Sequence, residues 1–485
     1  MTNQEARALY QKGEEVTVAY LVEITNRLKA IEAKFSSLEA RLNLNSQNSS
    51  KPPSTDQNKT NKNRSLRKSS GRKPGAQPGH KGKNLEKVDN PDEVIAHRPE
   101  VCLHCQAKLE GVEANGYTAR QVFEIPEPKI VVTEHRVFCV TCPCCAKEAK
   151  AQFPQGVEQA VQYGPRILGF ATYLSADHLV PYARVVKIIQ EFTGVALSQG
   201  TLDTALQTAF VGLQNFELRL ILALRRVGIL HVDETGGWIN KVRYWFHVRC
   251  TKTLTYLFCH KNRGKEATDD LLTYTGRLVS DFFASYKDLD CLHQFCMAHI
   301  CLCMAHICRE LVGVFEKTKQ SWALELKEHL EHCNKACHAA RDRGSAKLWN
   351  ARILACEYDE FVKAGIRANP LAPAVWNAKS KKWKPAALST ARALLERLRD
   401  RRGDCLAFLF DLSVPFTNNE AERGVRMLKV KSKISGCFRI LEGATRFCRL
   451  RSYVQTCGKQ GLNRLECLVS VFRGEPILPA FQMDG

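Results

Sequence analysis

Apolar residues near the start of the chain recur at alternating steps of three and four. The positions are Leu21, Ile24, Leu28, Ile31, Phe35, Leu38 and Leu42, and no Gly or Pro interrupts residues 14–51. These steps are those of the a and d positions of a coiled coil, so they predict a leucine-zipper-like helix within residues 1–45. Such a helix either packs on its own core or joins a second copy of the chain. The polar segment that follows favours the homo-oligomer.

The hydrophobic pattern stops after this helix. Residues 45–87 contain eleven Lys and Arg residues but only two acidic residues, Asp56 and Glu86, and apolar residues are nearly absent. Such a segment has no core to offset the entropy of ordering it. We therefore interpret residues 46–98 as a flexible basic arm. Arg72 and Lys73 are then candidate contacts to DNA phosphates, and a merely solvated linker is the alternative.

Residues 160–225 show helical spacing. A first helix ends near Gly194, and Ser198 is placed to cap the next one. The pair predicts either a helix-turn-helix DNA-binding segment or two ordinary packed helices.

Strand patterns dominate the next part of the chain. Residues 228–234, 243–250 and 253–260 are rich in β-branched and aromatic side chains, and short strands are predicted at 277–282 and 291–295, with a helix at 264–275 between the two groups. A long helical stretch follows to about residue 400. This order predicts an α/β, ribonuclease H-like catalytic domain over residues 226–455 with a large helical insertion at about 310–410. Residues 456–485 are left as a C-terminal tail.

Composition and charge indicate the kind of binding partner and the cellular compartment. The chain has 485 residues, 44% of them hydrophobic, so it is long enough for several domains. Its formal net charge of +21 favours nucleic acid as a partner over a merely basic surface. No stretch approaches 18 consecutive apolar residues and no secretory signal is evident, which predicts a cytoplasmic protein without a membrane partner.

Two C-x-x-C pairs stand out among the 21 cysteines. Cys102 and Cys105 form the first, Cys142 and Cys145 the second, and the residues between them resemble strand, Pro-rich turn and strand. A pair at each end of a hairpin is suited to a structural Zn²⁺ held by four thiolates, so residues 99–152 are a zinc-finger-like β-hairpin segment. Cys139 and Cys144 are substitute ligands, and scattered reduced cysteines are the alternative.

Acidic residues end two of the predicted core strands. Asp233 ends the first and Asp281 the fourth, and these strands are neighbours in the proposed fold. A third carboxylate is expected from the late helix containing Glu420 and Glu422. Thr417 and Glu420 fit a capping box, which leaves Glu422 to face the sheet. Three such carboxylates can hold two Mg²⁺ for phosphodiester chemistry, although acids at strand ends are often only turn residues.

Several motifs, taken together, resemble the insertion sequence 66 family of transposases. They are "LHVDETG", "LVSDFFASY", "FTNNEAERGVRMLKVKSKISGCFR", "FCRLRSYVQT", "NLNSQNSSKPPS" and "GRKPGAQPGHKG", with the two Cys pairs. The resemblance runs over nearly the whole chain. It implies a DDE transposase with a leucine-zipper-like N-terminus, a zinc-finger-like segment, and Asp233, Asp281 and Glu422 as the catalytic triad.

The segment "CMAHICLCMAHIC", residues 296–308, carries one six-residue sequence twice. The simplest interpretation is a tandem duplication of seven residues. On a helix, seven residues make almost two turns and shift the following chain by about 10 Å, which threatens the position of Glu422. Metal binding by His299 and His306 is the alternative.

The sequence thus predicts a DNA transposase that cleaves transposon ends and transfers the strands into target DNA. Cations after Glu422 are a candidate track for DNA phosphates: Arg423, Arg426, Lys429, Lys431, Lys433, Arg439, Arg446, Arg449 and Arg451. A decayed copy that only binds DNA and a ribonuclease H-like nuclease without strand transfer are the alternatives. Accessory proteins of the same element are further possible partners.

Overall fold

The computed structural model describes residues 10–42, 82, 85–271, 274–280, 292–295, 306–371, 373, 375–377, 382–384 and 388–481. The chain divides into two compact units, one formed by Met1–Asn63 with His135–Gly485 and the other by Arg64–Glu134. Within the described residues, no helix combines the length and the apolar character that crossing a membrane requires.

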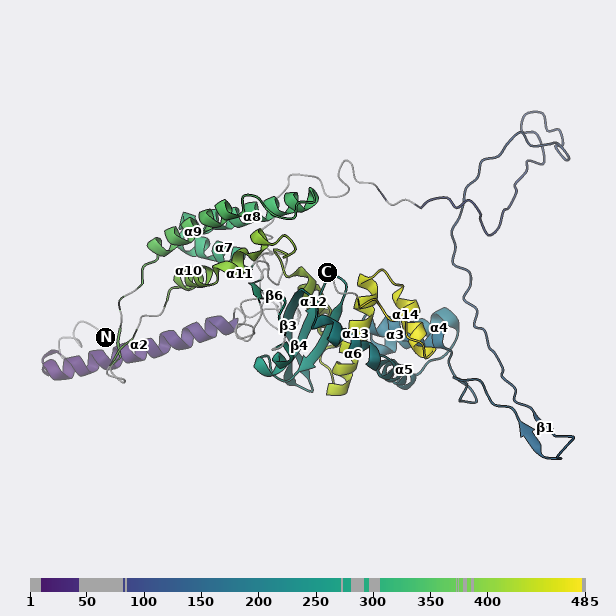
Figure 1. The fold of residues 1–485 in the computed structure, drawn as a ribbon, viewed down its shortest axis with the longest axis horizontal. Helices are drawn as coiled ribbons and strands as arrows, with labels where there is room; N and C mark the ends of the chain where they lie inside the picture. The colour runs from purple at the N-terminus through teal and green to yellow at the C-terminus, as the bar shows by residue number, and fades with distance from the viewer. Residues whose placement is uncertain are drawn as a thin grey trace. The chain divides into compact units, whose positions relative to one another are not determined.

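The heptad segment is helical, as predicted. Helix α2 spans Glu14–Leu42 (Figure 1). Of its a and d residues, Leu21 is 53% exposed and Ile31 is 60% exposed. These two seam positions are therefore not buried by the rest of the chain.

A five-stranded sheet forms the centre of the larger unit. Its strands are β3 (Ile229–Ile239), β4 (Val242–Cys250), β5 (Thr255–His260), β6 (Arg277–Ser280) and β7 (Leu292–Phe295). Their spatial order is β5-β4-β3-β6-β7, with antiparallel pairing among β3, β4 and β5 and parallel pairing of β3 with β6 and β6 with β7. The predicted strands are confirmed, and so is the predicted contact between the first and the fourth.

The predicted helix at 264–275 is wrong. The described residues there form two short 3₁₀ turns, Lys265–Ala267 and Asp269–Leu271. Thr268 and the two Asp residues that follow are poor helix formers, because their side chains compete for backbone hydrogen bonds.

Helix α12 (Asn419–Ser435) covers one face of the sheet (Figure 1). Its residues Ala421, Val425 and Leu428 pack with Phe246 and Val248 of β4 in one buried cluster. The spacing of three and four puts these apolar side chains on one helix face.

Another group of helices packs with the other face of the sheet through one shared core. These are α3 (Pro165–Ala176), α4 (Tyr182–Thr193), α5 (Gln199–Gly212), α6 (Gln214–Leu224), α13 (Leu441–Lys459) and α14 (Arg464–Phe472). They share a core with Leu230 and Val232 of β3. The expected turn is confirmed, since Gly194 is left-handed with φ 72° and the Ser198 side chain accepts from the Thr201 N–H. The segment predicted as a C-terminal tail contains α14, whose buried Leu468 and Val469 pack within the unit.

Helix α13 also protects the outer edge of the sheet. The hydroxyl oxygens of Ser452 and Thr456 accept hydrogen bonds from the backbone N–H groups of Leu257 and Thr255 in β5, at 2.8 and 3.0 Å. Edge strands with free backbone groups invite pairing with other chains. The helix satisfies these groups directly.

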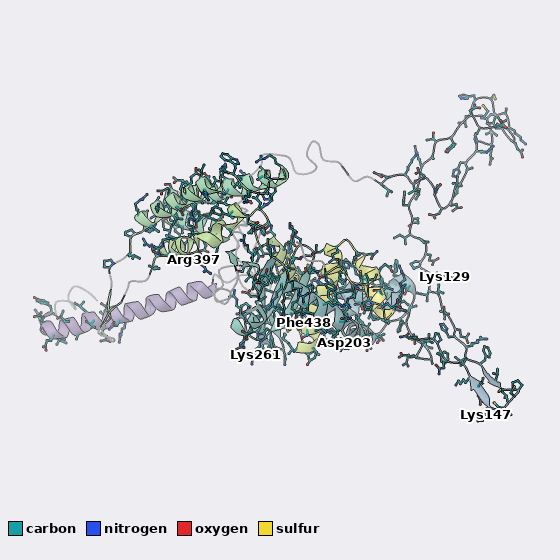
Figure 2. The ribbon with its side chains drawn as sticks, viewed as in Figure 1. Lys129, Lys147, Asp203, Lys261, Arg397 and Phe438 are labelled. Carbon is teal, nitrogen blue, oxygen red and sulfur yellow. The ribbon has the colours of Figure 1, made fainter. Side chains whose placement is uncertain are left out.

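The described residues where the helical insertion was predicted form a separate group of helices. It consists of α7 (His306–Thr318), α8 (Ser321–Asp342), α9 (Ala351–Ala368), α10 (Thr390–Asp400) and α11 (Arg402–Phe410), with the short strands β8 (Val375–Asn377) and β9 (Lys382–Lys384) between α9 and α10. These helices have their own buried core. Arg397 of α10, labelled in Figure 2, forms an ion pair with Glu310 of α7.

The predicted hairpin between the two Cys pairs is wrong. The described residues 110–138 contain no strand. Pro126 and Pro128 lack the N–H groups that a ladder needs, and Val122 and Val132 are 89% and 88% exposed. Instead, β1 (Cys139–Thr141) and β2 (Glu148–Lys150) form a small hairpin around the second pair, and a Val101–Lys108 bridge closes the first.

Candidate active site

Asp233 lies on β3 with its side chain on the face that α12 covers. Alternate residues of a strand share a face, and the cross-strand partner of Asp233 is Val248, which packs against α12. Asp233 is 5% exposed. Its Oδ1 accepts a hydrogen bond from the Glu234 N–H at 2.8 Å. The carboxylate is therefore buried and oriented by the backbone.

The first turns of α12 lie directly over this part of the sheet. At Gly424, an added Cβ would come within 2.7 Å of the Val248 side chain, so only glycine permits this close approach. Glu422 is two residues before Gly424, in the first turn, and is partly buried. The helix thus brings the strand region of Asp233 and the helix turn of Glu422 together.

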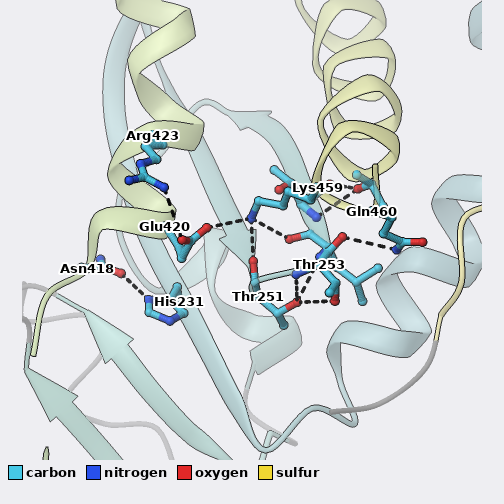
Figure 3. Close-up of polar contacts among 11 residues, drawn as sticks. His231, Thr251, Thr253, Asn418, Glu420, Arg423, Lys459 and Gln460 are labelled. Atoms are coloured by element: carbon cyan, nitrogen blue, oxygen red, sulfur yellow. Dashed lines mark hydrogen bonds and ion pairs between the residues drawn. The ribbon is translucent and has the colours of Figure 1, made fainter. Parts of the chain in front are cut away.

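Asn418 fastens the start of α12 to β3. Its Nδ2 donates to the Val232 carbonyl at 2.8 Å, and its Oδ1 lies 2.9 Å from Nδ1 of His231. Because the amide oxygen can only accept, Nδ1 of His231 carries the hydrogen. Burial, the largest influence, lowers the pKa of His231 to about 4. Figure 3 shows this contact beside Glu420.

Glu420 is engaged, although not as predicted. The N-terminal cap of α12 is Asn418, without a side-chain capping bond, so the capping box of Thr417 and Glu420 is wrong. Asn418 uses its side chain to reach β3 instead. Glu420 forms ion pairs with Lys459 of α13 at 3.3 Å and with Arg423 at 3.7 Å (Figure 3).

Asp281 lies outside the described residues. The strand before it, β6, ends at Ser280 and runs parallel to β3, with His231 opposite Val279. Within the described part of the chain, no three His, Cys, Asp or Glu side chains gather into a metal-binding group. The meeting of Asp281 with Asp233 and Glu422 stays a prediction.

These positions fall inside a match to a known family. A sequence model described as Transposase IS66 family matches residues 160–446, which is more than half of the chain. The chain belongs to this family. Residues 1–86 of this IS66 family transposase match a second model, described as a family of unknown function (DUF6444). The comparison with curated proteins finds no match.

The predicted phosphate track of the transposase divides into two classes. Arg423, Arg426 and Lys433 are exposed on α12, while Lys431 lies over the Phe438 ring at 5.6 Å and has its pKa lowered by burial. Lys429 is partly buried. Arg72 and Lys73 lie outside the described residues.

The last three cations of the track are internal, and assigning them to DNA was wrong. Arg446 pairs with Asp203 at 2.6 Å (Asp203 is labelled in Figure 2), and Arg449 pairs with Glu217 at 2.6 Å. Arg451 pairs with Asp177 at 2.6 Å, and both side chains are 4% exposed. Each joins α13 to the helices of residues 160–225.

Both C-x-x-C pairs adopt the same tight turn. The N–H of Gln106 donates to the Cys102 carbonyl at 2.9 Å, and the N–H of Ala146 donates to the Cys142 carbonyl at 2.9 Å. Gln106 and Ala146 both have positive φ, 59° and 52°. Backbone N–H groups point at the first sulfur of each turn and lower the pKa of Cys102 (His104, then Cys105) and of Cys142 (Cys145, then Cys144).

Such turns stabilise the thiolate form, which is the form that binds metal. The first turn belongs to the smaller unit and the second to the larger one. A single four-thiolate site therefore stays a prediction.

The duplicated segment lies mostly outside the described residues. Its end is described, where α7 begins at His306. Ile307 and Cys308 are 0% and 2% exposed in the core of the insertion. Cys308 is therefore a packing residue, while His299 lies outside the described part.

Sequence reasoning missed His231 and Asn418. Both stand in the quoted motifs, next to the carboxylates. His231, as a histidine in a strand, carries no local sign of the contact, and the position of Asn418 directly before the carboxylate-bearing helix was the available signal.

Proposed function

We propose that this protein is a DNA transposase that cleaves the ends of its element and joins them to target DNA. The observation that supports this best is the position of α12, which brings the turn containing Glu422 over the strand containing Asp233. The strand β6, which directly precedes Asp281 in the chain, pairs in parallel with β3.

The strand order supports a ribonuclease H-like assignment for this domain. The spatial order is β5-β4-β3-β6-β7; within it, the three antiparallel strands and the adjacency of the first and fourth strands are as the sequence predicted. In this arrangement the first and fourth strands are adjacent, and β6 ends beside the part of β3 that holds His231 and Asp233.

The donor set fits Mg²⁺. Asp233, Asp281 and Glu422 offer hard carboxylate oxygens, which Mg²⁺ prefers. Two bound Mg²⁺ would neutralise charge on the attacking and leaving oxygens of a phosphodiester. The chain's own part is positioning: the Glu234 N–H orients Asp233, and Asn418 holds α12 on the strand. Hydrolysis by water would release a 3′-hydroxyl at the transposon end. This hydroxyl would then attack a target phosphodiester in line, forming a new phosphodiester bond and displacing the 3′-oxygen of the target strand.

The test is a cleavage and joining assay with DNA carrying the element's ends, in Mg²⁺. Asp233→Asn, Asp281→Asn and Glu422→Gln are each expected to lower both rates by about two orders of magnitude or more. Glu420→Gln is the matched control, because Glu420 is held by Lys459 and Arg423. If Glu420→Gln abolished activity while Glu422→Gln retained it, the assignment would be reversed.

The duplicated segment favours one alternative, a copy that binds DNA without cutting it. A variant lacking residues 296–302 restores a single copy of the repeat. If this variant cleaves DNA and the full chain does not, the duplication has disabled this copy. If neither cleaves but both bind the ends, the binding-only function stands. Cleavage without joined products would instead identify a nuclease.

We also propose a structural Zn²⁺ held by Cys102, Cys105, Cys142 and Cys145. The support is the identical turn at each pair, with N–H groups that favour the thiolate. Self-association through α2 is proposed as well, supported by the exposure of Leu21 and Ile31.

A further inference from the structure

The face of the sheet opposite α12 has an unusual outer half. The side chains of Leu230, Val232 and Tyr256 on this face pack with the core that includes α6. Farther along the same strands, alternation places Trp238, Arg243 and Trp245 on this face. Trp238 is 41% exposed. The covering helices therefore protect only the inner half.

We call this outer half the aromatic face and define it as Trp238, Arg243, Trp245, Phe258 and Arg263. The guanidinium of Arg243 lies 4.6 Å from the centre of the Trp245 ring, and that of Arg263 lies 4.8 Å from it. Phe258 stacks with His247 at 5.0 Å and with Tyr256 at 5.2 Å. Rings and cations thus alternate across three strands.

Contacts with residues of β3 hold the side chains of the aromatic face in place. Arg263 donates from Nε to Glu234 at 2.9 Å, with Nη2 at 2.8 Å from the same oxygen, and the Glu234 side chain is 1% exposed. Gly236 is the cross-strand partner of Trp245. A Cβ there would lie 3.1 Å from the Arg243 guanidinium, so glycine leaves room for that side chain to lie across β3.

An ordinary packing cluster would explain buried rings, but it does not explain the exposed ring of Trp238, whose cross-strand partner is Arg243. Unpaired bases offer flat π-faces to Trp and Phe, and the phosphates between them attract Arg. The charge also favours a polyanion, because the chain carries a formal net charge of +21. A duplex buries its base faces in the stack and has no such surface to offer.

We propose that the aromatic face binds a stretch of DNA whose bases are unpaired, by stacking on Trp238. This inference rests on the proposed function, because it places the stretch next to the cleaved strand. Trp238 is five residues beyond Asp233 on the same strand, about 17 Å along β3 at about 3.3 Å per residue, and its side chain lies on the opposite face of the sheet. An unpaired strand that leaves the carboxylates therefore reaches the aromatic face by passing around the β3–β4 end of the sheet.

The test uses the full chain with Asp233→Asn, so that bound DNA is not cut. Binding of a short mixed-sequence DNA strand, and of the duplex made from it, is measured by fluorescence anisotropy. Trp238→Ala is expected to weaken single-strand binding by about fivefold to a hundredfold and to change duplex binding less than about twofold, because only unpaired bases stack. Trp238→Phe keeps a ring and is expected to recover most of the affinity.

The matched control is Trp349→Ala, since Trp349 is 85% exposed between helices of the insertion. Equal effects of Trp238→Ala and Trp349→Ala on the single strand would overturn the inference, as would an equal loss on the duplex. If no variant, nor the parent chain, binds DNA of either kind, the proposed transposase function fails as well. If the chain binds the duplex but not the single strand, the inference about the aromatic face is contradicted, whereas the proposed transposase function is not.

Discussion

Nδ1 of His231 lies 2.9 Å from Oδ1 of Asn418, although the two residues are 187 positions apart in the chain. His231 is two residues before Asp233, and Asn418 directly precedes the helix that carries Glu422. With its second bond, to the Val232 carbonyl, Asn418 sets where α12 begins relative to β3. This amide side chain therefore helps to set the distance between the two carboxylate-bearing elements, together with the close packing of Gly424 on Val248.

Asn418→Ala should loosen this attachment. It removes both hydrogen bonds and leaves buried partners at His231 and Val232, so the expected loss of stability is about 1–3 kcal/mol. Because α12 can then shift, the Mg²⁺ concentration needed for half-maximal cleavage should rise. Thermal unfolding and a Mg²⁺ titration of the cleavage rate measure these two effects.

The control variant Asn463→Ala distinguishes a loss of positioning from a loss of stability alone. Asn463 caps α14 by accepting from the N–H groups of Leu465 and Glu466, and losing such a cap costs about 1 kcal/mol. This variant should be destabilised without a change in Mg²⁺ requirement. If both variants shift the Mg²⁺ titration equally, Asn418 has no positioning role.

His247 should make stability depend on pH. Burial and then the charge of Arg249 lower the pKa of His247 to about 4, from an ordinary value of 6.5. In the window between these values the unfolded chain binds more protons, so stability is lost as the pH falls from about 6.5 towards 4. Between pH 7 and pH 5 this one group should cost about 2 kcal/mol.

His247→Phe keeps a ring against Phe258 and removes the titration. Chemical denaturation at pH 7 and pH 5 should show a smaller acid-induced loss for this variant than for the parent chain. His338→Gln, at an exposed position on α8, is the control. An unchanged difference between the two pH values in His247→Phe would contradict the assignment.

The sheet was predictable because its signals are local. β-branched and aromatic runs identified the strands. The prediction that Asp233 ends the first strand was wrong, because β3 continues past it to Ile239. The choice of Glu422 over Glu420 stays a prediction, and the reason given for it was wrong: Glu420 pairs with Lys459 of α13 and does not form a capping box. An ion pair between helices that are distant in the sequence cannot be predicted from the spacing of residues within one helix.

The same limit explains the error in the phosphate track. Arg426 and Arg451 look alike in sequence, because each is a cation on a helix with mixed polarity. Arg451 differs only because Asp177 stands opposite it in the fold, 274 positions earlier. No pattern within α13 identifies such a partner. The aromatic face was missed for a related reason, since its residues become a surface only when three strands align.

The zinc site is tested by metal content. Cys105→Ser and Cys145→Ser should each lower bound zinc in the purified chain, because a thiolate is lost from a set of four. Cys356→Ser, at an exposed position on α9, should leave the zinc content unchanged. Full zinc in both Cys105→Ser and Cys145→Ser would contradict the site, and loss in Cys139→Ser or Cys144→Ser would identify a substitute ligand.

Substitutions of the exposed basic residues on α12 and of the paired basic residues on α13 should have different effects on stability and on DNA binding. Arg451→Ala leaves Asp177 buried without its closest cation, and removing one partner of a buried ion pair costs about 3–5 kcal/mol. Arg464 lies 3.1 Å from the same carboxylate, so the loss of stability should be near the lower end of this range.

Arg426→Ala, at an exposed position, should leave stability unchanged. It should instead weaken binding of end DNA for all sequences and reduce the slope of log affinity against log salt by about one. Denaturant unfolding and DNA titrations between about 50 and 200 mM salt distinguish the two. A stable Arg451→Ala with a reduced salt slope would return Arg451 to the DNA-binding track, because only a phosphate contact changes the slope without changing the fold.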